Sequence, residues 1–412
     1  MFFYNIGIYI ANFHLKIIAL FNNKLKLGVD GRKQTFKILE HSINKGDSTL
    51  WFHCASLGEY EQGLPVFRAL RQEYPSHKIV LTFFSPSGYE IRKNTEIADV
   101  VVYLPMDTTT NAKRFLNLVH PELSVFVKYD IWPNYMAELK RRGARALLIS
   151  ALFRKNQSYF KPYGTMMRSA LSVFEHIFVQ NESSKTLLNS IHFENVSIAG
   201  DTRFDRVYDQ LNQNNSLPFI EDFKDGKLCV VIGSSWPEDE ALLIPFINNY
   251  NKEDVKYIIA PHNIKSGQIQ NLAYKLQKPT VLFSEMDGKH LSEYSVFIID
   301  TIGILSKIYS YADIAYVGGA MGNTGLHNIL EPAVFGVPII IGKNYDKFPE
   351  AYQMIDSGGL TSVSGYDQLY SELPLVIENN HKRQNLGAIN QEFILKNKGA
   401  VNQILDYIRK YI

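Results

Sequence analysis

Residues 316–332, YVGGAMGNTGLHNILEP, combine a short apolar strand, a loop with four glycines and a helix that carries Glu331. Glycines let the backbone come close to a phosphate. A glutamate in the first helical turns can accept hydrogen bonds from both hydroxyls of a ribose. The loop matches neither G-x-G-x-x-G nor a P-loop, so NAD and ATP are poor candidates. The stretch therefore predicts an α/β unit with another nucleotide at the strand end, in preference to a plain strand–helix turn.

The same succession of strand and helix repeats along most of the chain. Short apolar runs alternate with segments long enough for helices, which is typical of a parallel sheet covered on both faces. The expected strands are 51–56, 78–84, 100–104, 123–127, 146–150, 176–180, 196–199, 228–234, 257–261, 280–283, 296–300, 314–318 and 338–342. The fold class is therefore α/β, with two Rossmann-like, doubly wound domains.

An interruption of this pattern divides the chain. Residues 211–227 are rich in Asn, Asp, Lys and Pro, with few periodic apolar positions, and predict a linker. The expected parts are an N-terminal helix with a basic flank (1–40), a first domain (41–210), the linker, a second domain (228–380) and a C-terminal helix that returns to the first domain (381–412). Because ligands bind at the carboxyl ends of the strands in such sheets, we expect the active site in a central cleft between the domains.

The overall composition is that of a globular protein without a nucleic-acid partner. The chain has 412 residues, more than one compact core usually holds, and 46% of them are hydrophobic. The net charge of +2 gives no indication of nucleic-acid binding. Cys54 and Cys229 lie in apolar runs, which favours buried thiols over a disulfide. Because no metal-ligand spacing is convincing, no metal is expected.

The N-terminus is mostly apolar over residues 1–21 but lacks the basic start and small-residue cleavage site of a secretory signal. It is barely long enough to span a bilayer, where its polar residues would be costly. A basic run follows, made of Lys16, Lys24, Lys26, Arg32, Lys33 and Lys37. An apolar helix with a basic flank indicates a helix in the interface of an anionic membrane. A buried N-terminal helix of a soluble domain is the alternative.

The motif Ser56-Leu57-Gly58-Glu59 comes directly after the first expected strand. Gly58 permits a tight turn, and Glu59 enters the first turn of the next helix. A carboxylate beside the positive helix end stays ionised and can act as a general base toward a hydroxyl. The alternative is ordinary helix capping, with Ser56 as the N-cap, and these four residues alone favour it.

Two more motifs follow strands of the second domain. Residues 233–240, GSSWPEDE, place Ser234 and free N–H groups at a helix start, which can cradle an anion. A well-capped helix with an acidic first turn is the alternative. Residues 260–263, APHN, contribute His262, although a lone histidine is more often structural. In the glycine loop, a helix start near Asn323 would add a second contact to the anion.

Four motifs together resemble the bacterial 3-deoxy-D-manno-octulosonic acid (Kdo) transferases of lipid A and lipopolysaccharide assembly. These motifs are SLGE at 56–59, DIWPN at 130–134, GDTRFD at 200–205 and GLHNILEP at 325–332, in the same order as in the family. The resemblance extends from the N-terminal helix to about residue 360. It implies a GT-B fold, CMP-Kdo as donor, a lipid A precursor as acceptor, inversion at the sugar and no metal or other cofactor. It also implies a place on the cytoplasmic face of the inner membrane.

The resemblance assigns acceptor binding to the first domain and CMP-sugar binding to the second. It makes Glu59 the proton acceptor, with Asp130 and Arg203 as further catalytic residues. CMP contacts are expected from Ser234, Pro261, His262, Ile302, Gly303, Ile304, Asn328, Ile329, Leu330 and Glu331. Support for donor or acceptor is expected from Ser56, Gly58, Lys128, Gly322 and Asn323.

Four positions depart from the family pattern. Lys128 stands where the family usually has glutamate, which reverses the charge. Arg203 replaces the usual lysine and keeps the charge with a different geometry. His262 replaces the usual arginine, which makes phosphate binding pH-sensitive, and Ile304 replaces a glutamate.

The resulting hypothesis is a direct in-line displacement. Glu59 takes a proton from an acceptor hydroxyl, that oxygen attacks the anomeric carbon of Kdo, and CMP leaves. Arg203, His262 and the helix starts near Ser234 and Asn323 would stabilise the leaving phosphate. Two alternatives remain: another GT-B enzyme that uses a UDP-sugar, and a non-enzymatic envelope assembly protein. The second would be favoured by a Glu59 that is buried and paired.

Overall fold

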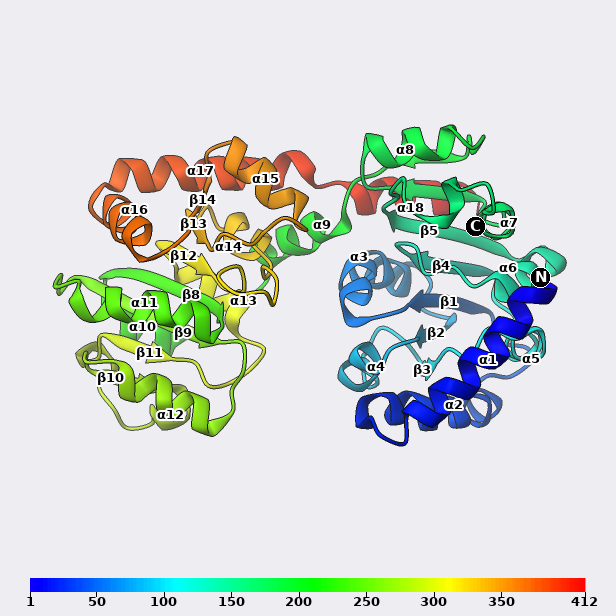
Figure 1. Cartoon of the computed structure of the whole chain (residues 1–412), viewed down its shortest axis with the longest axis horizontal. Helices are drawn as coiled ribbons and strands as arrows, with labels where there is room; N and C mark the ends of the chain where they lie inside the picture. The colour runs from blue at the N-terminus through cyan, green and yellow to red at the C-terminus, as the bar shows by residue number, and fades with distance from the viewer. Residues whose placement is uncertain (412) are drawn as a thin grey trace. The chain divides into compact units, whose positions relative to one another are not determined.

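The computed structural model describes residues 1–411 (Figure 1). The chain divides into two compact units. Unit 1 comprises Met1–Arg206 and the C-terminal segment that begins at Lys398, and unit 2 is Val207–Asn397. Each unit is built around one seven-stranded sheet in which all neighbouring strands are parallel. The expected α/β class with two doubly wound units is confirmed.

The seven strands predicted for the first domain are all present in unit 1. They are β1 (Thr49–Cys54), β2 (Lys78–Phe83), β3 (Val100–Tyr103), β4 (Leu123–Val127), β5 (Arg145–Ala151), β6 (His176–Val179) and β7 (Val196–Ile198). The helices are α1 (Phe2–Ile18), α2 (Asn23–Ser42), α3 (Leu57–Glu73), α4 (Pro86–Arg92), α5 (Thr109–Val119), α6 (Pro133–Arg142), α7 (Thr165–Leu171), α8 (Glu182–Asn189), α9 (Thr202–Asp209) and α18 (Ala400–Tyr411). The strand order is β3-β2-β1-β4-β5-β6-β7, so the ends of β1, β4 and β5 lie side by side.

Strand β1 shows why both faces of this sheet are covered. Trp51 belongs to one buried hydrophobic cluster, whereas its neighbours Leu50 and Phe52 belong to another. Successive strand residues point to opposite faces, so the two clusters lie on opposite sides of the sheet. Burial of such side chains contributes roughly 1.5–3 kcal/mol each. That is why the strand sequences are continuously apolar rather than alternating.

The expected basic flank is itself a helix, α2, which packs on the edge strand β3. Its Arg32 does not face outward, and this part of the expectation is wrong. The Arg32 guanidinium donates to the carbonyl oxygens of Phe84 and Leu104 and lies 4.3 Å from the centre of the Phe84 ring. An arginine with two backbone acceptors and an aromatic contact is bound to the fold. The other five basic side chains of the segment are exposed.

Helix α1 has no buried residue and exposes large apolar side chains, among them Phe2, Phe3, Ile10 and Phe13. It is nevertheless attached to unit 1 by its polar residues. The Tyr4 hydroxyl donates to Asp107 Oδ2 at 2.7 Å, and Asn134 Nδ2 donates to Asn5 Oδ1 at 2.8 Å. Within residues 1–411, no helix is both long and apolar enough to cross a membrane.

Unit 2 repeats the architecture with one strand more than predicted. Its strands are β8 (Leu228–Ser235), β9 (Val255–Pro261), β10 (Thr280–Leu282), β11 (Val296–Ile298), β12 (Ile314–Val317), β13 (Ile339–Ile341) and β14 (Leu360–Ser362). Its helices are α10 (Pro218–Lys224), α11 (Pro237–Asn249), α12 (Ser266–Lys275), α13 (Leu305–Ile308), α14 (Leu330–Val334), α15 (Pro349–Asp356), α16 (Tyr366–Glu378) and α17 (Asn380–Asn397). The order is β10-β11-β9-β8-β12-β13-β14. The unpredicted strand, β14, has only three residues, two of them polar.

The segment 211–227 contains an ordered helix, α10, in addition to irregular chain. Ile220 and Phe223 of this helix are fully buried, and the Leu217 N–H donates to the Tyr311 hydroxyl at 2.6 Å. The polar composition that predicted a linker conceals these apolar anchors. The segment thus belongs to the packed body of unit 2.

The expected C-terminal helix is two helices that belong to different units. Helix α17 packs on α14 and α16 in unit 2, and α18 packs on α3 in unit 1. Gly399 between them has a φ of +113°, a conformation that glycine adopts readily. The Asp205 carboxylate accepts the N–H groups of Gly399 at 2.8 Å and Ala400 at 3.1 Å, which starts the second helix.

Candidate active site

Glu59 is the third residue of α3, directly beyond the end of β1. It is only 7% exposed, and its Oε2 accepts the backbone N–H of Ala55. The glutamate therefore supplies a capping bond, whereas the side chain of the N-cap residue Ser56 makes none. Within residues 1–411, no basic side chain forms an ion pair with Glu59, and its Oε1 accepts no hydrogen bond. Glu59 is thus buried but not ion-paired, and one oxygen is left for a substrate proton.

The neighbouring Gly58 does not make a tight turn, which corrects the sequence-based expectation. It has no positive φ, and a Cβ added to it would meet no atom within 4 Å. Gly58 therefore leaves open space beside the start of α3, and it is not needed there for a positive φ. Such space is suited to a substrate group next to Glu59.

The surroundings of Glu59 raise the pKa of its carboxyl. Burial is the main cause, and the negative charge of Asp130 adds to it. The Ala55 N–H, His53 and Lys128 act in the opposite direction and lower this pKa. A carboxylate with a raised pKa binds a proton more strongly than an exposed glutamate, which is useful in a general base.

Asp130 is held by a buried hydrogen-bond network. Its Oδ2 lies 2.8 Å from His53 Nε2 and accepts the Trp132 indole N–H at 2.9 Å. The opposite ring nitrogen of His53, Nδ1, lies 2.8 Å from the Thr82 hydroxyl, which also accepts the Trp51 indole N–H at 2.9 Å. His53 and Thr82 are fully buried. The network orients the carboxylate whose charge acts on Glu59.

Sequence reasoning missed His53 and Thr82 in this network. Both occupy inward positions of strands, in the runs TLWFHC and KIVLTF, where a polar residue among apolar ones carries no chemical pattern. The available signal was the polarity itself, because a buried polar side chain needs a partner. Asn134 of the DIWPN motif likewise has a structural role, since its side chain donates to the Asp107 carbonyl at 2.6 Å and to α1.

Arg203 is the second residue of α9 and has an acidic partner. Its guanidinium forms an ion pair with Asp201 at 2.8 Å, and its backbone N–H donates to Asp201 Oδ1 at 2.9 Å. Lys128 follows β4 and is electrostatically coupled to Glu59 and Arg203. The structure thus brings together Glu59, Asp130, Lys128 and Arg203 at the strand ends of unit 1.

In unit 2, the start of α11 is occupied by the protein's own acidic residues. Asp239 Oδ2 accepts the N–H groups of Trp236 at 2.9 Å and Gly319 at 2.8 Å, and Asp239 Oδ1 accepts the Tyr316 hydroxyl at 2.9 Å. These amides therefore have partners already, in line with the alternative of a capped helix. The Ser234 residue before them has a left-handed φ of +54°, and its carbonyl packs under Gly318, where a Cβ would come within 2.4 Å.

His262 lies in a stack of three rings. Its ring centre is 4.5 Å from that of Trp236 and 4.6 Å from that of His327. The Trp236 indole N–H donates to His327 Nε2 at 3.0 Å, so this nitrogen carries no proton. Burial, with the nearby His262, lowers the pKa of His327 to about 4, and burial also lowers the pKa of His262. Both shifts favour the neutral form of the two rings. Trp236 and His327 were not predicted as site residues.

The glycine loop is longer than expected. No helix starts near Asn323, which corrects the prediction: α14 begins at Leu330. Gly322 is fixed against α11, because a Cβ there would come within 2.9 Å of the Glu238 carboxyl carbon. Asn323 is exposed. Asn323 can therefore contact a ligand through its exposed side chain, but not through the dipole of a helix.

Glu331 is oriented by two side chains. Asn328 Nδ2 donates to its Oε1 at 3.1 Å, and the Ser306 hydroxyl donates to its Oε2 at 3.2 Å. The neighbouring Ile329 and Leu330 are core residues, exposed by 1% and 0%, so a ligand can reach only their backbone. The contacts of Ser306 and Asn328 fix the carboxylate in one orientation, as recognition of a diol requires.

The stretch Ile302–Gly303–Ile304 follows β11 and leads into α13. Ile302 is 78% exposed, and Gly303 has a φ of +93° that favours glycine. An exposed apolar side chain on a loop that leads to Ser306 is suited to contact with a flat ring. The structure thus places this stretch on the same side of unit 2 as Glu331.

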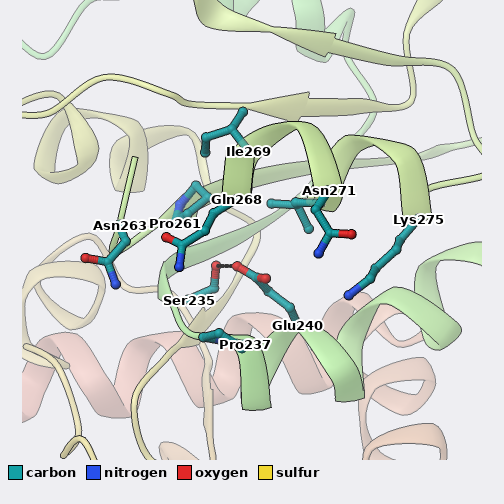
Figure 2. A pocket seen from close by; sticks show the side chains of 10 residues that line it. Ser235, Pro237, Glu240, Pro261, Asn263, Gln268, Ile269, Asn271 and Lys275 are labelled. Carbon is teal, nitrogen blue, oxygen red and sulfur yellow. Dashed lines mark hydrogen bonds between the residues drawn. The ribbon is translucent and has the colours of Figure 1, made fainter. Parts of the chain in front are cut away.

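A small pocket of about 160 Å³ lies between α11 and α12 (Figure 2). Its lining residues are Ser235, Pro237, Glu240, Pro261, Asn263, Gln268, Ile269, Asn271, Leu272 and Lys275. Figure 2 shows the Ser235 hydroxyl, which donates to Glu240 Oε1 at 3.1 Å, with Pro261 nearby. Of the predicted CMP-binding residues, Pro261 lines this pocket. Within residues 1–411, no group of three or more His, Cys, Asp or Glu side chains is placed to hold a metal.

Comparisons with known proteins show which family the chain is similar to. Residues 30–206 match the family model of 3-deoxy-D-manno-octulosonic-acid transferase (kdotransferase). The 3-deoxy-D-manno-octulosonic acid transferase of Haemophilus influenzae is 28% identical over 389 residues, which cover 88% of this chain and 87% of the relative. The Rickettsia bellii transferase is 25% identical and covers 92% of this chain and 91% of its own. The chain is thus similar to Kdo transferases over most of its length. The resemblance seen in the four motifs is thereby confirmed, and the relatives extend it over both units of the chain.

Solved structures support the fold. The UDP-GlcNAc 2-epimerase of Neisseria meningitidis has a TM-score of 0.61 at 15% identity and covers 88% of this chain and all of its own. MurG of Acinetobacter baumannii has a TM-score of 0.55 at 11% identity, with coverages of 88% and 99%. Identities this low concern the fold alone. They confirm that this chain has a GT-B-like architecture.

Proposed function

We propose that this chain transfers Kdo from CMP-Kdo to a lipid A precursor, with Glu59 as the general base. The observation that carries the proposal is the match to curated Kdo transferases across both units, at 25–28% identity. Unit 1 holds the acceptor and the base, and unit 2 holds the donor nucleotide. The chain is therefore a glycosyltransferase that acts in lipopolysaccharide synthesis.

The proposed reaction is a single displacement at the anomeric carbon. Glu59 Oε1, which has no hydrogen bond in the described chain, takes the proton of an acceptor hydroxyl. The acceptor oxygen forms a bond to the anomeric carbon, and the bond from that carbon to the CMP phosphate oxygen breaks with its electron pair. The sugar configuration inverts. Asp130 supports the base by raising the pKa of Glu59, and Arg203 supplies positive charge in the transition state.

The nucleotide contacts are proposed on the basis of unit 2. Glu331, oriented by Ser306 and Asn328, accepts the two ribose hydroxyls. His262 and the backbone of the glycine loop hold the phosphate. Residues 302–304 contact the base. The proposal that no metal takes part rests on the family resemblance, and turnover is accordingly expected to persist in EDTA.

The proposed location is the cytoplasmic face of the inner membrane, where the lipid acceptor is made. Support comes from α1, which presents Phe2, Phe3 and Phe13 outward at 72%, 86% and 63% exposure. Exposed apolar area of this size on a helix, together with nearby lysines, favours the interface of an anionic bilayer. Attachment there raises the effective concentration of the acceptor.

Glu59→Gln tests the function most sharply among single substitutions. The glutamine amide keeps the shape of the side chain, and its oxygen can still accept the Ala55 N–H. The pKa of Glu59 is raised mainly because burial disfavours its charged form, so the neutral glutamine avoids the free-energy cost of a buried charge. We expect unchanged or higher thermal stability, normal CMP binding and a turnover lower by about 100-fold or more. Glu73→Gln, at the other end of the same helix, is the matched control and should keep its activity. A near-normal rate for Glu59→Gln refutes the assignment of the base.

A further inference from the structure

Lys128 of unit 1 has no role in the displacement reaction proposed above. It directly follows β4, in a left-handed backbone conformation with a φ of +71°, and its N–H donates to the Ile149 carbonyl at 2.9 Å. A non-glycine residue in this conformation carries some strain. The strand end therefore holds the lysine in a defined place.

The ammonium group of Lys128 is partly buried and, in the described chain, has neither an ion-pair nor a hydrogen-bond partner. Within residues 1–411 it forms no ion pair and no hydrogen bond, and it lies 5.7 Å from the centre of the Tyr129 ring. Burial is the main cause that lowers its pKa. Removal of a charged group from water without a hydrogen-bonding partner costs free energy, and a bound ligand can recover it.

The charges of two arginines act on this group: Arg154 follows β5, the strand next to β4, and Arg203 lies in α9, after the edge strand β7. The charges of Arg203 and Arg154 also lower the pKa of Lys128, whereas Glu59 and Asp201 raise it. Arg203 is engaged by Asp201. Arg154 follows β5, the strand next to β4, and within the described chain its guanidinium forms no ion pair. Within the described chain, Lys128 and Arg154 are thus two cations without an ion-pair partner, after adjacent strands, and the charge of the buried Glu59 acts on Lys128.

We propose that Lys128 and Arg154 bind an oxyanion of a substrate, a carboxylate or a phosphate, beside Glu59. This inference rests on the proposed function, in which the donor sugar is an acid and the acceptor lipid carries phosphates. An ammonium provides three donors and a guanidinium a planar fork, and together they match the oxygens of such a group.

The bound oxyanion has a defined effect on catalysis. It fixes one substrate near Oε1 of Glu59 and so favours the geometry of attack. Its negative charge also compensates the two cations when the substrate is in place. Lys128 therefore acts on substrate affinity and positioning, while proton transfer stays with Glu59.

The test compares three variants of the full chain. Lys128→Met removes the charge but keeps an unbranched side chain with the same backbone preference, and Lys128→Arg keeps the charge. Lys155→Met is the matched control, on an exposed lysine next to Arg154. Because the lost charge has no ion-pair or hydrogen-bond partner within residues 1–411, the unfolding temperature of Lys128→Met should equal or exceed that of the wild type.

Initial rates are measured with CMP-Kdo varied, and then with the lipid A precursor varied, with both of its phosphates or with one removed. We expect kcat/KM of Lys128→Met to fall about 10- to 100-fold, with Lys128→Arg less affected and Lys155→Met unchanged. A defect in KM for CMP-Kdo that is equal for both acceptors identifies an oxyanion of the donor. A defect that disappears with the acceptor that lacks a phosphate identifies that phosphate.

Three results overturn the inference: Lys128→Met within twofold of the wild type for both substrates, an equal loss in Lys128→Arg, or an equal loss in Lys155→Met. A failure of the proposed function is distinguishable from these. In that case the wild type itself transfers no Kdo, whereas an active wild type with an insensitive Lys128→Met defeats this inference alone.

Discussion

Replacement of Thr82 by valine should destabilise unit 1 because it removes the centre of the buried network under Asp130. The hydroxyl of Thr82 accepts the Trp51 indole N–H at 2.9 Å and lies 2.8 Å from His53 Nδ1. All three side chains are fully buried. A valine has nearly the same shape but leaves the two neighbouring nitrogens without a partner and without access to water.

The magnitude follows from these contacts. A buried polar group without a partner costs about 1–3 kcal/mol, and the extra methyl group recovers about 0.8 kcal/mol. Because the valine leaves two buried nitrogens without a hydrogen-bond partner, the free energy of unfolding should fall by about 2–5 kcal/mol. The matched variant Thr82→Ser keeps the hydroxyl and loses one methyl group, which costs about 1 kcal/mol.

Hydrogen–deuterium exchange in increasing urea is the appropriate assay, because a two-unit chain need not unfold in one step. Peptides from β1 and β2 report on unit 1, and peptides from β8 and β9 report on unit 2 as an internal reference. We expect Thr82→Val to lower protection in the first set only, and more than Thr82→Ser does. Equal protection in the two variants would show that the hydroxyl does not hold the network together.

Two further predictions concern the base and the membrane. Asp130→Asn removes a negative charge that raises the pKa of Glu59. Because the base works only when ionised, the acidic limb of the pH profile of kcat/KM should move to lower pH. A limb that stays in place or moves to higher pH would contradict the coupling of Asp130 to Glu59. Replacement of both Phe3 and Phe13 by aspartate should weaken binding to anionic vesicles about 10-fold or more in a sedimentation assay. The control Tyr274→Asp, at a tyrosine of unit 2 that is 90% exposed, should leave binding unchanged. An equal loss of binding in both variants would argue against α1 as the membrane contact.

The architecture could be predicted from the sequence because a doubly covered parallel sheet needs continuous apolar strands. Strand β4 in unit 1 and β12 before the glycine loop are buried at every position. The pattern does not extend to β14, where three residues pair with β13. Nor does it reveal α10, whose contacts are made by Ile220 and Phe223 in an otherwise polar stretch. Short elements depend on tertiary packing, which local composition does not encode.

The candidate site was predictable where a motif placed a residue after a strand, as for Glu59 and Glu331. The partners that orient these residues were not. Ser306 is distant in sequence from Glu331, and His53 lies within an apolar strand. The helix start at Trp236 also looked open to an anion, although Asp239 occupies it. Which polar groups are already satisfied is a property of the folded chain, and the sequence alone does not state it.

The central claim is that this chain moves Kdo from CMP-Kdo to a lipid acceptor. Mass spectrometry of the lipid after incubation of the full chain with CMP-Kdo and a lipid A precursor, together with quantification of released CMP, tests it most directly. The account predicts lipid heavier by whole Kdo residues, with one CMP released per residue added. An unchanged lipid with CMP-Kdo, together with a lipid that gains a sugar from a UDP-sugar instead, would contradict it.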